Sequence, residues 1–195
     1  MSPSRPLYLS AALLLGLALG SVPGRAAGAG AQGTPLTSLI TTVAHDTGRK
    51  FVLDPGVAAN VVLIGENPGR VTYPQLLTLL ATEGYAAVPE GDYVRIVPDH
   101  LVRVMPLPVV GSDARLPDDQ VVTTVFMVHS VPAGWLVPIL RPLVPQWGHL
   151  AAMPCTNALV IVERLANVRR LEAVVRALDK GPPIKHPRCA IPMPR

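Results

Sequence analysis

The sequence has few charged and few aromatic residues, and both shortages restrict what the protein can do. Charged residues make up 15% of the 195 positions and aromatic residues 4%, whereas hydrophobic residues make up 49%. A hydrophobic fraction this high can bury a core, which excludes an intrinsically disordered chain. Lys and Arg form no cluster beyond Arg169-Arg170, and the formal net charge is only +4, so nothing supports nucleic-acid binding.

Cysteine is also scarce, with one at Cys155 and one at Cys189. In an oxidising compartment the two could form a disulfide that ties the Pro-rich tail to the preceding module. The alternative is two unpaired cysteines. Because a Cα separation cannot be read from sequence, both readings stay open here.

Long hydrophobic runs are absent after the N-terminal region. That region has a basic residue, Arg5, an apolar run from Leu7 to Leu19, and small residues that end in Ala27-Gly28-Ala29. This order is typical of a signal peptide with its cleavage site, which we place over residues 1–29. The alternative, a membrane anchor, is disfavoured because the run is shorter than the ~20 residues that span a bilayer.

Residues 34–99 predict a first small module in the order helix, strand, strand, helix, strand, strand. Thr34 and Pro35 suit the start of the first helix, and Gly48 suits its end. Its apolar stripe has helical spacing: Leu36, Leu39, Ile40 and Val43. The later elements are expected at 51–53, 60–65, 73–83, 85–88 and 93–97, with capping-box spacing at Thr72 and Gln75 and a four-residue loop at 89–92.

Residues 100–119 read as a Pro/Gly-rich linker, in which 101–105 could add an edge strand. Residues 120–180 then predict a second module, with strands at 121–128, 148–153 and 157–162 and helices after Ser130 and over 165–179. The first of these helices should have Trp135, Leu136, Ile139, Leu140 and Leu143 on its apolar side and a bend at Pro138. The tail, 181–195, has too many prolines to fold alone. The fold class is α+β, built from two small modules.

The sequence offers no convincing catalytic, cofactor or metal site. Gly28 to Gly33 matches G-x-G-x-x-G, but no strand precedes it and the predicted cleavage near Ala29 would split it. The five histidines never fall at helical spacing and no cysteine motif joins them: His45, His100, His129, His149 and His186. We therefore expect no enzyme, no cofactor and no metal.

Several stretches in combination resemble the N-terminal periplasmic modules of type II secretion secretins, of the general secretion pathway protein D kind. In the first module these are T-G-R-K-F-V-L-D-P-G-V, V-V-L-I and E-G-Y-A-A-V-P-E-G-D-Y-V-R-I-V-P. In the second they are V-V-T-T-V-F-M-V-H-S-V-P-A-G-W-L-V-P-I-L-R-P-L-V, T-N-A-L-V-I-V and A-N-V-R-R-L-E-A-V-V-R-A-L-D. The resemblance implies a first-module α/β sandwich followed by a KH-like βαββα ring-building module, without RNA binding because the G-x-x-G clamp is missing.

The resemblance also implies a periplasmic role in assembly, with the secretin or the inner-membrane platform component as partner. The later ring modules and the channel barrel of the family have no counterpart here. The family's first strand would have to come from Gly30 to Gly33, which has no β-forming residues, so a sheet edge could be open to a partner's strand. The candidate partner-binding residues are Phe51, Val52, Leu53, Val61, Val62, Leu63 and Ile64; as an alternative they are ordinary sheet core.

Other functions remain open at this point. The first module also resembles the signalling domain of TonB-dependent transducers, which would predict an anti-sigma regulator as partner. A small-molecule-binding or enzymatic domain and a truncated secretin remnant are further alternatives. We expect a monomer or weak dimer in isolation.

Overall fold

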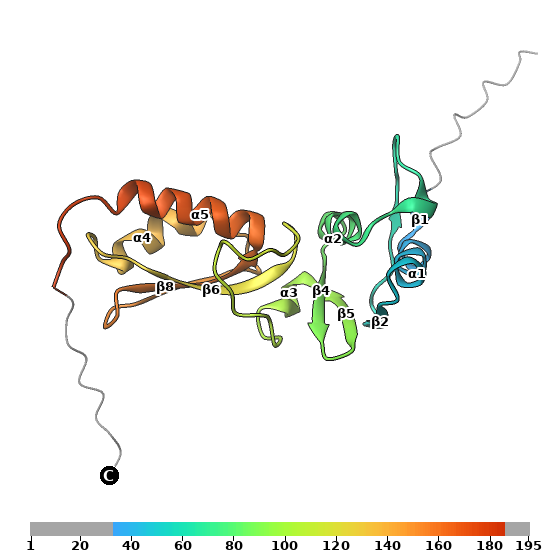
Figure 1. Cartoon of the computed structure of the whole chain (residues 1–195), viewed down its shortest axis with the longest axis horizontal. Coiled ribbons are helices and arrows are strands. Elements are labelled where there is room, and N and C mark those ends of the chain that lie inside the picture. The colour runs from blue at the N-terminus through green and yellow to red at the C-terminus, as the bar shows by residue number, and fades with distance from the viewer. Residues whose placement is uncertain (1–32, 186–195) are drawn as a thin grey trace, which may run out of the picture. The chain divides into compact units, whose positions relative to one another are not determined.

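The structure, a computed structural model, describes residues 33–185 (Figure 1). The predicted signal peptide, Cys189 and most of the tail lie outside the described residues. The described part contains two sets of helices and sheets, one in each predicted module, and is α+β as expected. The division into modules at 34–99 and 120–180 stays a prediction.

The first module has two helices, a three-stranded sheet and a two-stranded sheet. The three-stranded sheet has the order β2-β5-β4, with β2 parallel to β5 and β4 antiparallel to it. The two-stranded sheet pairs β1 with β3. The elements are β1 (Thr34–Pro35), α1 (Leu36–Thr47), β2 (Lys50–Leu53), β3 (Asn60–Val61), α2 (Tyr73–Thr82), β4 (Tyr85–Glu90) and β5 (Tyr93–Pro98), with a 3-10 turn at Pro68–Arg70.

The helices of this module form where the sequence predicts them. The stripe on α1 is buried at all four positions, and Gly48 ends the helix with φ 68°. Gln75 accepts a hydrogen bond from the Thr72 backbone N–H at 2.8 Å, which confirms this half of the capping box at the start of α2. The stripe of α2 is buried as well, at Tyr73, Leu76, Leu77 and Leu80.

Two predictions at the start of this module are wrong. Thr34 and Pro35 do not open the helix: they form β1, because Thr34 pairs with Val61 and Pro35 with Asn60. The backbone N–H of Leu36 then bonds to the carbonyl of Ala59 at 2.9 Å, in place of a side-chain cap. A strand before the first helix is therefore present at Thr34–Pro35, whereas residues 30–32 of the segment expected to supply it lie outside the described part.

The other two differences concern strand length. The strand expected over 60–65 covers only Asn60–Val61. The β4–β5 hairpin is longer than expected, because Glu90 pairs with Tyr93 and leaves two residues in its loop. Gly91 in that loop has φ 58°, a conformation that favours glycine.

The second module packs two helices on one face of an antiparallel sheet with the order β6-β8-β7 (Figure 1). Its element order is βαββα, as predicted. The elements are β6 (Val121–Met127), α4 (Ala133–Leu140), a 3-10 turn (Arg141–Leu143), β7 (His149–Met153), β8 (Ala158–Arg164) and α5 (Leu165–Leu178). Val122, Thr124 and Phe126 on one face of β6 are buried, and so is Val128 directly after the strand.

The start of α4 differs from the prediction. Ser130 does not cap it; its hydroxyl donates to the carbonyl of Gly181 at 2.7 Å. The helix begins after Pro132, and the side-chain carbonyl of Asn157 accepts the N–H of Ala133 at 2.7 Å. Only part of the expected apolar side is buried, since Trp135 and Ile139 face outward.

The segment between the modules is ordered, and the edge strand expected at 101–105 is absent from it. A short helix, α3 (Asp99–Val102), takes its place. The guanidinium of Arg169 on α5 donates to the carbonyls of Ser112 at 3.0 Å and Ala114 at 2.9 Å and also pairs with Asp118. The segment is therefore held to the second module by side-chain contacts despite its prolines.

Candidate interaction surfaces

The first group of predicted partner-binding residues, Phe51 to Leu53, lies on β2 at an edge of the three-stranded sheet. Phe51 and Leu53 turn inward and pack against the core as half-buried residues. Val52 turns outward and is 45% exposed. The group thus combines a sheet edge with one exposed apolar side chain.

The second group, Val61 to Ile64, begins on β3 and continues past its end. Val61 is buried, whereas Val62 is 51% exposed and Ile64 is 91% exposed. Beside them is a hollow of about 230 Å³ whose far wall is the outer side of α2; its lining is Val62, Leu63, Ile64, Glu66, Val71, Gln75, Thr78 and Leu79. The two groups belong to different sheets, so the structure does not join them into one edge.

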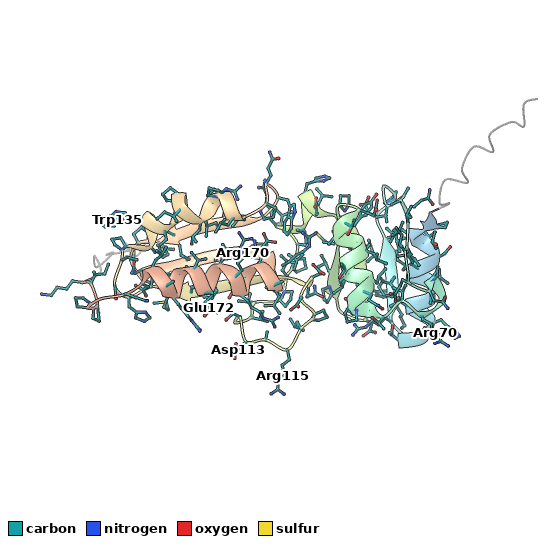
Figure 2. The ribbon with its side chains drawn as sticks, turned by 90° about the horizontal axis from the view of Figure 1, so that it is seen from above. Arg70, Asp113, Arg115, Trp135, Arg170 and Glu172 are labelled. Atoms are coloured by element: carbon teal, nitrogen blue, oxygen red, sulfur yellow. The ribbon has the colours of Figure 1, made fainter. Side chains whose placement is uncertain are left out.

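Sequence reasoning missed a third surface, on the second module. The sheet face opposite α4 and α5 exposes Val125, Met127 and Met153, which are 51%, 55% and 49% accessible. On the other side, α4 exposes Ile139 and Trp135, which is 71% accessible and points away from the module core (Figure 2). Exposed large apolar side chains gathered on a face are typical of protein-contact surfaces. The signal was present, because β6 carries apolar residues on both of its alternating faces.

Asp179, directly after α5, is hydrogen-bonded to the loop between β6 and α4, residues 129–131; we call this set of bonds the clasp. The carboxylate of Asp179 accepts the backbone N–H groups of His129 at 2.9 Å, Ser130 at 2.5 Å and Val131 at 3.2 Å. Burial raises the pKa of Asp179, but the three backbone donors and His129 outweigh it and hold the pKa below its usual value. The N–H of Ile184 adds a bond to the carbonyl of His129 at 2.8 Å.

Two other ionisable groups are perturbed by burial. Desolvation raises the pKa of Glu163, which is 2% exposed, against the opposing hydrogen bonds from the Arg164 backbone and Asn167. Burial likewise raises the pKa of Tyr73, opposed by the Arg49 guanidinium 4.3 Å from its ring centre. In both groups burial is the largest cause of the shift in pKa.

Within residues 33–185 no three His, Cys, Asp or Glu side chains come together as a metal site. His45 contacts Asp46 at 3.2 Å and His129 contacts Asp179 at 3.4 Å. The described part also has no helix with the length and apolar character needed to cross a bilayer. The predicted pairing of Cys155 with Cys189 involves a residue outside the described part and stays a prediction.

Comparison with known proteins supplies the family. The model of the GspD-like N0 domain matches residues 31–96. Secretin XcpQ of Pseudomonas aeruginosa is 37% identical over 147 residues, which are 74% of this chain and 22% of XcpQ. Secretin GspD 2 of Escherichia coli O78:H11 is 32% identical over 152 residues, 75% of this chain and 22% of that protein.

A solved outer membrane complex of the type II secretion system of Klebsiella pneumoniae, which contains PulD, PulS and the HR domain of PulC, shows the same fold. The similar chain has a TM-score of 0.65 at 24% identity, over 78% of this chain and 26% of that one. The present chain spans about a fifth of the length of the curated relatives it matches. We conclude that it belongs to the type II secretion secretins, of which it carries the N-terminal modules, beginning with a GspD-like N0 domain.

Proposed function

We propose that the chain is a non-catalytic assembly module of a type II-like secretion system that works in the periplasm by contacting other proteins of the apparatus. The N-terminal modules of secretins are not enzymes, which agrees with the expectation from the sequence. The partner would be the secretin or the inner-membrane platform component. Export would depend on the signal peptide predicted over residues 1–29.

The observation that carries this proposal is the exposed apolar stretch Val62 to Ile64 beside the hollow next to α2. Ile64 gains almost nothing from the fold of its own chain, since it is 91% exposed. Burying a side chain of this kind stabilises a complex by about 1.5–3 kcal/mol. Glu66 and Gln75 are joined by a 2.9 Å hydrogen bond, and they place a polar rim beside the apolar residues. An apolar centre with a polar rim is typical of protein interfaces.

The relatives support the choice of partner. PulD in the solved Klebsiella pneumoniae complex is accompanied by the HR domain of PulC and by PulS. We therefore test first the periplasmic domain of the cognate platform component and then the cognate secretin. A single short apolar segment suits a weak or transient interface, for which calorimetry is the appropriate method.

The experiment compares Ile64→Ser with Val104→Ser. Val104 is 78% exposed in the segment between the modules, so both changes remove an exposed apolar side chain with little effect on folding. Ile64→Ser should weaken binding of the platform domain about tenfold, while Val104→Ser should leave it unchanged. If neither the platform domain nor the secretin gives binding heat with the unaltered chain, the proposal fails.

The second module would contribute self-association, the ring-building role that the resemblance implies. Its support is the uncovered sheet face with Val125, Met127 and Met153 and the outward face of α4 with Trp135 and Ile139. We expect a monomer or weak dimer in isolation, because stable dimer interfaces need large complementary surfaces. Light scattering that finds a stable dodecamer-sized species would contradict this.

A further inference from the structure

We propose that the free edge of β2 binds an extended peptide strand that carries an acidic side chain, by adding it to the three-stranded sheet. This deepens the proposed function and rests on it, because it names the chemistry of a partner segment at the first candidate group, Phe51 to Leu53. The site is separate from Val62 to Ile64, so each can be tested without the other.

The backbone of β2 supplies the unsatisfied donors and acceptors. Among the described residues β2 pairs only with β5, which leaves its other side without a strand. The N–H of Asp54, just after β2, donates to the carbonyl of Ile96 at 2.9 Å. Because successive residues in a strand direct their backbone groups to opposite sides, Phe51 and Leu53 direct theirs away from β5. Such a row of free groups is a template for β-augmentation.

The side chains of β2 determine which residue types suit alternate positions of the added strand. On the inner face Phe51 and Leu53 are half-buried, so the core is not fully closed at this edge. An apolar residue of the partner beside them would complete their burial. On the outer face the exposed residues are Lys50 and Val52, so the next residue of the partner faces a cation and a valine.

The charges favour an acidic residue at that outer position. In the described part the salt bridges do not include Lys50, whose ammonium lies 5.7 Å from the ring centre of Tyr93. The neighbouring cation on this face, Arg95, is already paired with Glu90 at 2.9 Å. Lys50 is thus the cation available to a partner. A second copy of the chain is a poor occupant because it would bring its own Arg49 and Lys50 to the same edge.

The outer face also has space for a side chain that reaches across Val52. A hollow of about 290 Å³ lies over the sheet there and is lined by Val52, Glu90, Tyr93 and Arg95. Tyr93 is 49% exposed and can cover a methylene or methyl group of the partner. The site therefore combines an edge for the backbone, a cation for an acid and a hollow for an apolar side chain.

The probes are two blocked peptides, one of alternating glutamate and valine and one of alternating lysine and valine. The full chain should bind the glutamate peptide more tightly in calorimetry, and hydrogen exchange should then slow at the amides of Phe51 and Leu53. Lys50→Glu should weaken this binding about fivefold and reduce the preference for the glutamate peptide. The matched control is Arg70→Glu, an exposed charge reversal in the same module (Figure 2), which should change neither.

Three results would overturn the inference: no binding of either peptide, slowed exchange at Val62 to Ile64 instead of β2, or equal effects of Lys50→Glu and Arg70→Glu. None of these results bears on the outcome of the platform-domain experiment. Loss of peptide binding with retained platform binding removes only the β2 site. Retained peptide binding without platform or secretin binding instead removes the proposed function.

Discussion

The side-chain amide of Gln120 donates a hydrogen bond to the backbone carbonyl of Ala87 at 3.0 Å. It thereby connects the residue before β6, in the second module, to β4 in the first. Gln120 is only 3% exposed. Around it is a buried apolar cluster drawn from both modules and the segment between them: Ala86, Val88, Val97, Val102, Leu107, Val121 and Val162. The two sets of elements therefore share buried surface, and their stabilities should be coupled.

Gln120→Ala should lower the free energy of unfolding by about 1–3 kcal/mol, because it leaves a buried carbonyl without this donor. Chemical denaturation followed by fluorescence and circular dichroism measures the change. Gln146→Ala is the matched control, since Gln146 is exposed and its loss should be near neutral. Equal stability of the two variants would contradict the coupling role of Gln120.

Asn157 should be the most sensitive polar residue of the second module. Its amide donates to the carbonyls of Val128 at 2.6 Å and Val131 at 2.9 Å and accepts from Ala133, and its backbone has φ 51°. Asn157→Ala should cost about 3–5 kcal/mol, because it removes these bonds and leaves the left-handed backbone to a residue that disfavours it.

Asn157→Gly separates the two causes. Glycine accepts the positive φ but makes none of the side-chain bonds, so it should be less destabilising than alanine by about 1 kcal/mol. Thermal unfolding of both variants measures the difference. A glycine variant less stable than the alanine variant would show that the backbone conformation carries no cost.

The elements that the sequence predicts well are those in which one local rule decides. The buried stripe on α1 follows from the helical spacing of its apolar residues, and the helix end follows from the tolerance of Gly48 for a positive φ. Both predictions are confirmed. Thr34 and Pro35 also fit the residue preferences of a helix start, yet they form a strand that pairs with Val61 and Asn60. Local propensity cannot show such a pairing, because its free energy comes from residues distant in sequence.

The surfaces were less predictable for a related reason. Trp135 and Leu136 are both apolar and are neighbours in sequence on α4, but Trp135 is 71% exposed and Leu136 only 3%. Their hydropathy cannot show which of the two is buried, because that depends on which side of the helix faces the sheet. The Asp179 clasp was also hidden, because an aspartate at the end of a helix gives no indication of a loop about 50 residues earlier that supplies its donors.

The clasp predicts a particular pH dependence of stability. The pKa of Asp179 is lower in the folded chain than in the unfolded one, so the carboxylate binds protons more weakly when folded. Its contribution is therefore complete above the unfolded pKa, about 4, and is lost as the pH falls through the folded pKa. Asp179→Asn should be less stable than the unaltered chain at pH 7, and the difference should shrink in acid.

Denaturation at a series of pH values between 2 and 7 tests this clasp. Asp113→Asn is the control, because Asp113 lies in the segment between the modules (Figure 2) and accepts no backbone bond from the 129–131 loop. Its stability should run parallel to that of the unaltered chain at every pH. Parallel curves for Asp179→Asn as well would remove the clasp as the cause.

The predicted disulfide between Cys155 and Cys189 makes the last prediction. Cys155 lies in the turn between β7 and β8, so the bond would tie the tail to this end of the second module. If it forms, reduction should lower the free energy of unfolding by about 2–4 kcal/mol, since the oxidised unfolded chain has less conformational freedom. Cys189→Ser should show the lower stability with or without reductant. Thiol labelling of the oxidised, denatured chain checks the bond directly, because two reactive thiols would mean that both cysteines remain unpaired.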